Sequence, residues 1–272
     1  MCSGETWAFT LPADADWHEV YSTPGGILGR CGCVPKCIVL LGRAALLVVW
    51  VATTLWSVTE WVEVSDLELK FWFTKLTHWG ALLQIMYFAL LFVTTYLASS
   101  NCGCCSKSTG TPWFVKLTWF FGSMMPSVTL IITVLYWGLI YEDNGNGPDA
   151  ISVAMHGFNY ILVLVDLLFT RQPFYLKHFW SSVLAGFLYS VFTYVYFQLG
   201  GTYQDGVSEY IYEAIDWNDA GKTLTVLLGA TFVAAPAFHA LHWAIVLVRR
   251  MTACGKELPK QPQETSTMKA SE

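Results

Sequence analysis

Charged residues are scarce in this chain of 272 residues. Asp, Glu, Lys and Arg make up 13% of it, whereas hydrophobic residues make up 54%; a typical soluble domain is about one quarter charged. This shortage excludes an ordinary soluble domain, and the mild net charge of −5 argues against a nucleic-acid partner. The chain also lacks a Pro- and Gly-rich linker, so we expect one membrane domain with short tails.

Residues 1–37 lack the apolar core of a cleavable signal peptide, and we interpret them as a cytosolic segment. Residues 38–248 contain apolar runs of about 20 residues, the length at which a helix crosses a bilayer. The polar residues 249–272 are expected to form a disordered cytosolic tail. The predicted fold class is all-α: a polytopic membrane protein with six transmembrane helices in one bundle. The predicted spans cover about residues 38–58, 74–98, 114–141, 151–171, 176–199 and 223–248.

Lys and Arg are nearly absent from three of the expected loops. Those loops hold only Lys70, Lys75 and Lys222, and the other twelve of the fifteen basic residues lie in the termini, the other two loops and the adjoining span ends. Because cytosolic segments carry the excess of Lys and Arg, the count predicts that both termini are cytosolic. The three acidic loops then face the outside or a lumen.

None of the eight cysteines lies in an expected outer loop, so we predict no structural disulfide. The cysteines close to the membrane are candidates for S-palmitoylation. A zinc site is an alternative, although the CxC and CxCC clusters differ from the usual C-x₂-C spacing, and simple reduced thiols are a third reading. The palmitoylation candidates are Cys31, Cys33, Cys37, Cys104 and Cys105.

Two expected spans carry polar residues near their outer ends. Thr77 and Gln84 share a face of the second span. In the fourth span, Asn159 and Tyr160 follow His156. A hydroxyl is a weak nucleophile until a base removes its proton, and histidine is the usual base at neutral pH. If the helices bring Thr77 and His156 together, the pair forms the core of a lipid-ester hydrolase that needs no metal or cofactor. Gln84 or Asn159 would stabilise the oxyanion, and Tyr160 would line the substrate.

A structural role for the same pair is the alternative. Thr hydroxyls in membrane helices commonly bond to their own backbone carbonyls. An intramembrane histidine often only bonds to a neighbouring helix. Spacing alone leaves both readings of Thr77 and His156 open, because one chain does not reveal the order of helices in the bundle.

A second polar group is expected at the inner end of the bundle. One reading is a transition-metal site, because two histidines three residues apart could join a carboxylate. The other is a hydrogen-bonded cluster in which Asp166 pairs with Arg171 or Lys177. The residues at comparable depth are Asp166, His178, His239 and His242.

The loop between the fifth and sixth spans carries a recognisable pattern. It reads Tyr196-Phe-Gln-Leu-Gly-Gly-Thr202, then Tyr210-Ile-Tyr-Glu-Ala-Ile-Asp-Trp217. Together with Leu76-Thr-His-Trp-Gly80, this pattern resembles the rolling stone family of multipass proteins over about residues 38–248. The resemblance implies a plasma-membrane protein linked in insects to myoblast fusion, and it implies no defined biochemical activity.

Rolling stone proteins are in turn similar to the androgen-induced family of intramembrane hydrolases. Those threonine hydrolases cleave fatty acid esters of hydroxy fatty acids. Leu76-Thr77 and Met155-His156 match the family's nucleophile and base positions, whereas His78-Trp79 departs from its pattern. The resemblance therefore implies Thr77 as nucleophile, His156 as base and a membrane lipid ester as substrate.

A non-enzymatic cell-surface factor in adhesion or cell fusion is the alternative function. It would act through the outer loop 200–219, towards a protein partner that the sequence does not identify. The aromatic residues of this loop have a second interpretation, in which Tyr210, Tyr212 and Trp217 fold over the bundle as a lid. A channel or transporter is disfavoured, because the sequence lacks a ring of like charges or a repeated filter.

Overall fold

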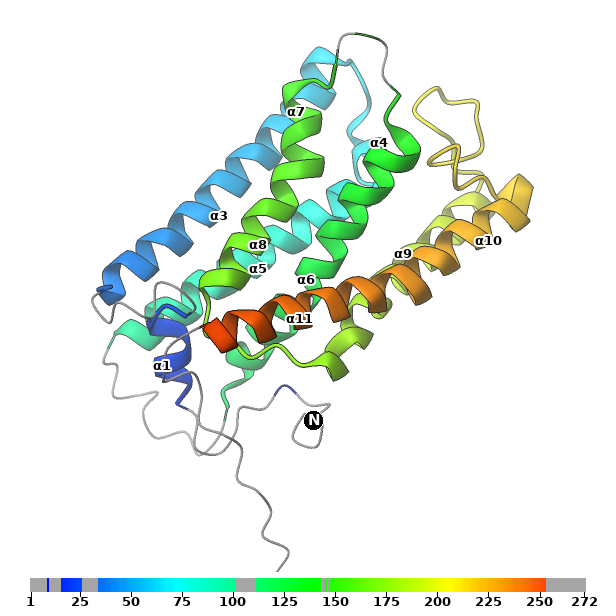
Figure 1. Cartoon of the computed structure of the whole chain (residues 1–272). Coiled ribbons are helices and arrows are strands. Elements are labelled where there is room, and N and C mark those ends of the chain that lie inside the picture. The colour runs from blue at the N-terminus through cyan, green and yellow to red at the C-terminus, as the bar shows by residue number, and fades with distance from the viewer. Residues whose placement is uncertain are drawn as a thin grey trace, which may run out of the picture.

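The computed structural model describes residues 9, 16–25, 34–100, 111–142, 145 and 147–252. Within these ranges every regular element is helical, apart from one isolated bridge between Tyr212 and Ile215. Six segments are long and apolar enough to cross a membrane, which confirms the predicted all-α, six-span architecture (Figure 1). They are Lys36–Val64, Leu76–Ser99, Trp113–Ile140, Ala150–Phe169, Leu176–Gln198 and Trp217–Met251.

Turns with non-α geometry lengthen several of these segments. A π-helical turn at Glu60–Val64 extends the first, and a 3₁₀ turn at Trp217–Asp219 begins the sixth. The sixth segment begins earlier than the hydropathy suggests because the Asp216 and Asp219 carboxylates accept from backbone N–H groups two or three residues on. The α-helices of the segments are α3 (Lys36–Thr59), α5 (Leu76–Ser99), α6 (Trp113–Leu135), α7 (Ala150–Val153), α8 (Asn159–Phe169), α9 (Trp180–Gln198), α10 (Ala220–Leu228) and α11 (Ala235–Thr252).

Helix α6 lies at the centre of the bundle, in contact with α5, α8, α9 and α11. Its buried face carries Val115 and Met125, and Phe88 and Leu91 of α5 pack into the same core. Helix α3 packs along α5 and leaves much of its apolar surface exposed, as expected for a helix that faces lipid. The connections at 65–75 and 199–216 and the residues 141–142 and 147–149 gather at one end of the bundle, with α1 (Trp17–Ser22) and the last turns of α11 at the other.

Glycine allows α5 and α6 to approach closely near the end of the bundle that holds these connections. A Cβ added at Gly80 would lie 2.3 Å from Cδ1 of Ile132. Gly186 of α9 has a similar role, because a Cβ there would lie 2.8 Å from Oγ1 of Thr231. These contacts bring α5 against α6, and α9 against the π-helical turn Gly229–Ala234.

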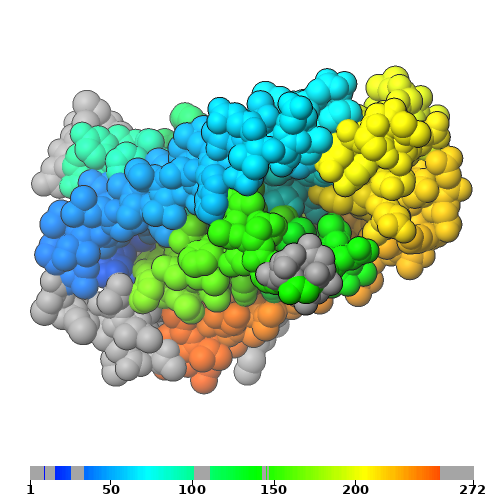
Figure 2. All heavy atoms as spheres, turned by 90° about the horizontal axis from the view of Figure 1, so that it is seen from above, coloured from blue at the N-terminus to red at the C-terminus, as the bar shows by residue number. Residues whose placement is uncertain are grey.

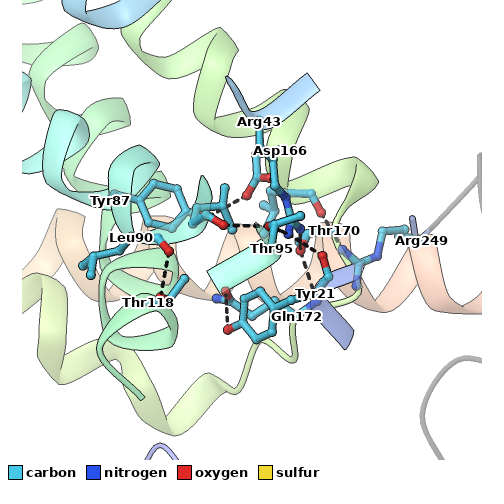
Figure 3. Close-up of polar contacts among 12 residues, drawn as sticks. Tyr21, Arg43, Tyr87, Leu90, Thr95, Thr118, Asp166, Thr170, Gln172 and Arg249 are labelled. Atoms are coloured by element: carbon cyan, nitrogen blue, oxygen red, sulfur yellow. Dashed lines mark hydrogen bonds and ion pairs between the residues drawn. The ribbon is translucent and has the colours of Figure 1, made fainter. Parts of the chain in front are cut away.

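A buried ion pair organises the opposite end of the bundle, near α1 (Figure 3). Arg43 of α3 is only 4% exposed, and its Nε lies 3.9 Å from Oδ1 of Asp166 on α8. Tyr87 donates to the other carboxylate oxygen at 2.5 Å, and Arg43 donates to the Tyr21 carbonyl at 2.7 Å. The sequence-based choice of Arg171 or Lys177 as partner of Asp166 is therefore wrong. Arg171 lies outside the helical segment and pairs with Glu19, at 2.7 Å.

Candidate active site

Thr77 and His156 meet near the end of the bundle that carries the three acidic connections. Thr77 is the second residue of α5, and His156 lies in the π-helical turn η3 (Ala154–Phe158), between α7 and α8. Nε2 of His156 lies 3.1 Å from Oγ1 of Thr77. Such π-helical turns are rare and frequently occur at functional sites.

The second ring nitrogen of His156 fixes the tautomer. Nδ1 lies 2.9 Å from the backbone carbonyl of Ser152. A carbonyl oxygen only accepts hydrogen bonds, so Nδ1 carries the proton and Nε2 is left as an acceptor. The Thr77 hydroxyl therefore donates to Nε2. Thr77, His156 and the Ser152 carbonyl thus have the arrangement of a nucleophile, its base and a group that orients the base, which is how enzymes activate a hydroxyl.

The ring of His156 is also held in place by Tyr136. The two rings stack with centroids 3.3 Å apart and planes 3° from parallel. The Tyr136 hydroxyl donates to Oγ of Ser152 at 2.9 Å, and that hydroxyl donates to Asp149 at 3.0 Å. Stacking and hydrogen bonding together restrict the imidazole to one orientation toward Thr77.

An apolar cavity of about 350 Å³ lies beside this pair, between α5, α6, α9, α10 and the following turn. Its volume falls within the roughly 300–1,000 Å³ typical of ligand sites. A smaller hollow of about 30 Å³ contains Thr77, Tyr136 and Tyr212. The two spaces adjoin, because they share five lining residues: Leu76, Ile132, Leu135, Ile215 and Val226. Thr77 thus lies at one end of a mainly apolar interior space.

The loop 200–216 closes one side of the site. The Tyr212 hydroxyl accepts from the backbone N–H of Leu76 at 3.0 Å and also contacts Thr77. Ile211 and Ile215 are buried, and the Trp217 indole N–H donates to Thr193 at 3.3 Å. Seen from above, this loop lies against the chain that leads into α5 (Figure 2). Tyr212 and Trp217 therefore face the bundle, as the lid interpretation predicts.

Lys75, the residue before α5, attaches the loop to the helix. Its side chain is 8% exposed, and its ammonium group donates to the Ile211 carbonyl at 2.8 Å. The nitrogen also lies 4.3 Å from the centre of the Tyr203 ring and 4.8 Å from that of Tyr212. Burial lowers the pKa of Lys75 to about 8.

The predicted oxyanion and substrate-lining residues lie deeper in the bundle. Gln84 is fully buried, and its amide nitrogen donates to the Asn159 carbonyl at 3.1 Å. The Asn159 side chain accepts from Thr133 and from the Tyr160 backbone. None of Gln84, Asn159 and Tyr160 lines either cavity. The physical reason is that seven residues along a helix place Gln84 about 10 Å from Thr77.

His239 and His242, the pair in the metal interpretation, bond to other groups. Nε2 of His242 lies 3.2 Å from the Tyr160 hydroxyl, and Nε2 of His239 lies 3.0 Å from the Tyr175 carbonyl. Across the described part of the chain, no three His, Cys, Asp or Glu side chains form a group that could hold a metal ion. These histidines and Asp166 are therefore not gathered as the metal interpretation requires.

Only one of the palmitoylation candidates falls within the described residues. Cys37 is an exposed free thiol in the first turn of α3. The remaining candidates, Cys31, Cys33, Cys104 and Cys105, lie outside the described residues. Palmitoylation stays a prediction.

Sequence reasoning missed three residues of the site, namely Lys75, Tyr136 and Tyr212. Tyr212 belongs to the aromatic pattern of the outer loop, so its position was visible but its contact with Thr77 was not. Lys75 directly precedes the Leu-Thr step. The sequence places no carboxylate beside it, so nothing in the sequence indicated that Lys75 is buried. The stacking of Tyr136 on His156 depends on the order of helices.

Comparisons with known proteins give one family. The family model described as "Protein rolling stone" matches residues 44–262. The chain is 28% identical over 140 residues to "Protein rolling stone" of Drosophila melanogaster, an alignment that covers 50% of each chain. The chain thus aligns with about half the length of this relative. No solved structure matches.

Proposed function

The chain belongs to the rolling stone family of multipass membrane proteins, and from this premise we propose that it hydrolyses long-chain lipid esters within the membrane. Thr77 is the nucleophile and His156 the general base. The observation that carries the proposal is the 3.1 Å contact between Thr77 Oγ1 and His156 Nε2, with His156 Nδ1 held by the Ser152 carbonyl.

The reaction proceeds in two halves. His156 Nε2 takes the hydroxyl proton while Thr77 Oγ1 attacks the acyl carbonyl carbon. As the ester C–O bond breaks, His156 returns that proton to the departing alkoxide, which leaves as the alcohol. Water, deprotonated by His156, then attacks the acyl-Thr77 ester. His156 protonates Thr77 Oγ1 as the carboxylic acid leaves.

The shape and lining of the interior space define the substrate class. The large cavity is bordered almost wholly by apolar side chains and adjoins the hollow that contains Thr77. An acyl chain placed there is shielded from water, and each buried methylene group contributes about 0.8 kcal/mol relative to its exposure in water. Its carbonyl carbon then lies at the Thr77 end. A polar or short-chain ester gains little from such a site.

The orientation of the bundle in the membrane follows from charge. Both termini are assigned to the cytosol and the three acidic connections to the outside of the plasma membrane, which places Thr77 just below the outer surface. Val207, 79% exposed at the tip of the outer loop, offers the test. In intact cells a membrane-impermeant maleimide should label Val207→Cys. Labelling only after permeabilisation would show that the bundle has the opposite orientation.

Hydrolysis is tested on purified protein in nanodiscs with a long-chain p-nitrophenyl ester. Thr77→Ala should abolish turnover. Thr53→Ala is the matched control, because the Thr53 hydroxyl bonds the Val49 carbonyl of its own helix, on a half-exposed face of α3 away from both cavities. It should leave turnover unchanged. Equal turnover by the wild type and Thr77→Ala would refute the proposal.

The exposed tip of the outer loop favours a second candidate, a cell-surface factor in adhesion or cell fusion. Asp205, Val207 and Glu209 face outward, although the rest of the loop packs on the bundle. Under this alternative, Glu209→Lys abolishes cell fusion and Thr77→Ala does not. Under the hydrolase proposal, Glu209→Lys leaves ester hydrolysis unchanged.

A further inference from the structure

Attack of Thr77 on an ester carbonyl places a negative charge on the carbonyl oxygen. Enzymes stabilise that charge with donors fixed in advance near the nucleophile, and one such donor commonly contributes 10²–10³-fold in rate. The amide of Gln84, expected from the sequence to do this, is bonded to Asn159 and lines neither cavity. The donor must therefore come from elsewhere around Thr77.

The Tyr212 hydroxyl is the polar side-chain group that the outer loop adds to this hollow. Its oxygen accepts from the Leu76 backbone N–H at 3.0 Å and lies beside that of Thr77. Both amides belong to the first turn of α5, where N–H groups have no partner within the helix. The helix N-terminus thus polarises the phenol, which makes the phenol a stronger donor.

The direction of the phenol proton follows from its neighbours. The Tyr212 hydroxyl contacts the hydroxyls of Thr77 and Tyr189. Tyr189 gives its proton to the Thr74 carbonyl, at 2.9 Å, and Thr77 gives its proton to His156. Both neighbouring oxygens can therefore accept from Tyr212, whose single proton goes to one of them at a time and points into the hollow when it faces Thr77. Burial raises the pKa of this phenol, so the proton is retained at neutral pH.

The loop segment that carries Tyr212 is held on both sides. The Ile215 N–H donates to the Tyr212 carbonyl at 2.8 Å and closes a tight turn. Lys75 donates to the Ile211 carbonyl, and Lys222 donates to the Glu213 carbonyl at 3.2 Å. A donor held in this way loses little free energy to reorganisation during the reaction.

We propose that Tyr212 donates the hydrogen bond that stabilises the oxyanion formed at Thr77. The outer loop is then part of the active site, and Lys75 is a positioning residue that holds it. This inference rests on the proposed hydrolase function. When an ester is bound, its carbonyl oxygen replaces the Thr77 hydroxyl oxygen as the acceptor of the Tyr212 proton.

The test compares Tyr212→Phe with Tyr210→Phe in the ester assay. Tyr212→Phe should lower kcat on the order of 10²–10³-fold with little change in KM. Tyr210→Phe, in the same loop but outside both cavities, should match the wild type. If Thr77→Ala abolishes turnover while Tyr212→Phe keeps a wild-type kcat, the oxyanion role is overturned and the hydrolase stands. If Thr77→Ala retains turnover, both proposals fall.

A binding measurement separates this role from a merely structural one. A long-chain trifluoromethyl ketone reacts with the nucleophile to form an oxyanion, whereas the matching ether does not. Tyr212→Phe should weaken ketone binding by about the same factor as kcat and leave ether binding unchanged. Equal loss of affinity for both compounds would show that Tyr212 only shapes the pocket, and would overturn the proposal.

Discussion

The imidazole Nε2 of His156 lies 3.1 Å from the Thr77 hydroxyl oxygen, although 79 residues separate the two along the chain. Separate contacts hold each of these two side chains in position. Thr77 is held in the first turn of α5, and His156 is held by the Ser152 carbonyl and the Tyr136 ring. The contact opens onto an apolar cavity, which distinguishes it from the similar contact between His242 and Tyr160.

His156→Gln should remove the general base and lower ester turnover about 10²–10⁴-fold. His242→Gln is the matched control. His242 also bonds a carbonyl four residues back through Nδ1 and a hydroxyl through Nε2, but that hydroxyl belongs to Tyr160, which lines neither cavity, whereas Thr77 lines the small hollow. Steady-state kinetics of both variants check the prediction. A similar loss in the two variants would mean that these histidines act only through structure.

A bulky residue in the cavity should shorten the acyl chain that the site accepts. Ala185 lines the large cavity, and Ala185→Phe should raise KM for a sixteen-carbon ester while sparing a four-carbon ester. Ala52→Phe, on the exposed side of α3, should keep the wild-type preference. Kinetics over a series of chain lengths provide the measurement. An unchanged chain-length profile for Ala185→Phe would show that the acyl chain does not bind in this cavity.

The pH dependence of stability should report the burial of Lys75. Its pKa is about 8 in the folded protein, against an ordinary 10.5. Between these values the unfolded chain binds more protons than the folded chain. The contribution of Lys75 to the free energy of unfolding therefore rises with pH from about 8 to 10.5 and is lost as pH falls through 8.

Melting temperatures at pH 7, 8 and 9.5 test this behaviour. The stability of the wild type relative to Lys75→Met should increase across the series. Lys70→Met is the control, because Lys70 is an exposed neighbour paired with Glu68. Its difference from the wild type should stay constant. A constant difference for Lys75→Met as well would mean that Lys75 keeps an ordinary pKa.

Loss of one member of the buried pair Arg43 and Asp166 should lower stability more than loss of both. Asp166→Ala leaves the Arg43 charge without its carboxylate in a buried site, which should cost about 3–5 kcal/mol. The double variant Arg43→Met/Asp166→Leu removes both charges and should recover much of that loss. Thermal unfolding of the single and double variants gives the comparison. A double variant less stable than Asp166→Ala would contradict it.

The fold was predictable from the sequence because the bilayer sets strict requirements. A segment that crosses it must be apolar and helical over about 20 residues, and such runs are visible in one chain. The ends of the spans were less clear, since the π-helical turn at Glu60–Val64 and the aspartate caps before α10 follow local geometry rather than hydropathy.

Contacts between distant segments were only partly predictable. Depth along the helices suggested that Thr77 and His156 lie at the same level, but their contact depends on the order of helices. Arg43 pairs with Asp166 from another helix, although its position near a span end was compatible with exposure at the interface. Tyr212 reaches Thr77 only because the outer loop folds back onto α5.

Identification of the residue that carries the acyl group tests the account most directly. Purified wild-type protein is incubated with a long-chain fluorophosphonate, and the modified peptide is sequenced by mass spectrometry. The account predicts one adduct, on Thr77, which is absent from His156→Gln and from protein pretreated with a long-chain ester analogue. An adduct on another residue, or an unmodified Thr77 in an enzyme that still turns over the ester, would contradict it.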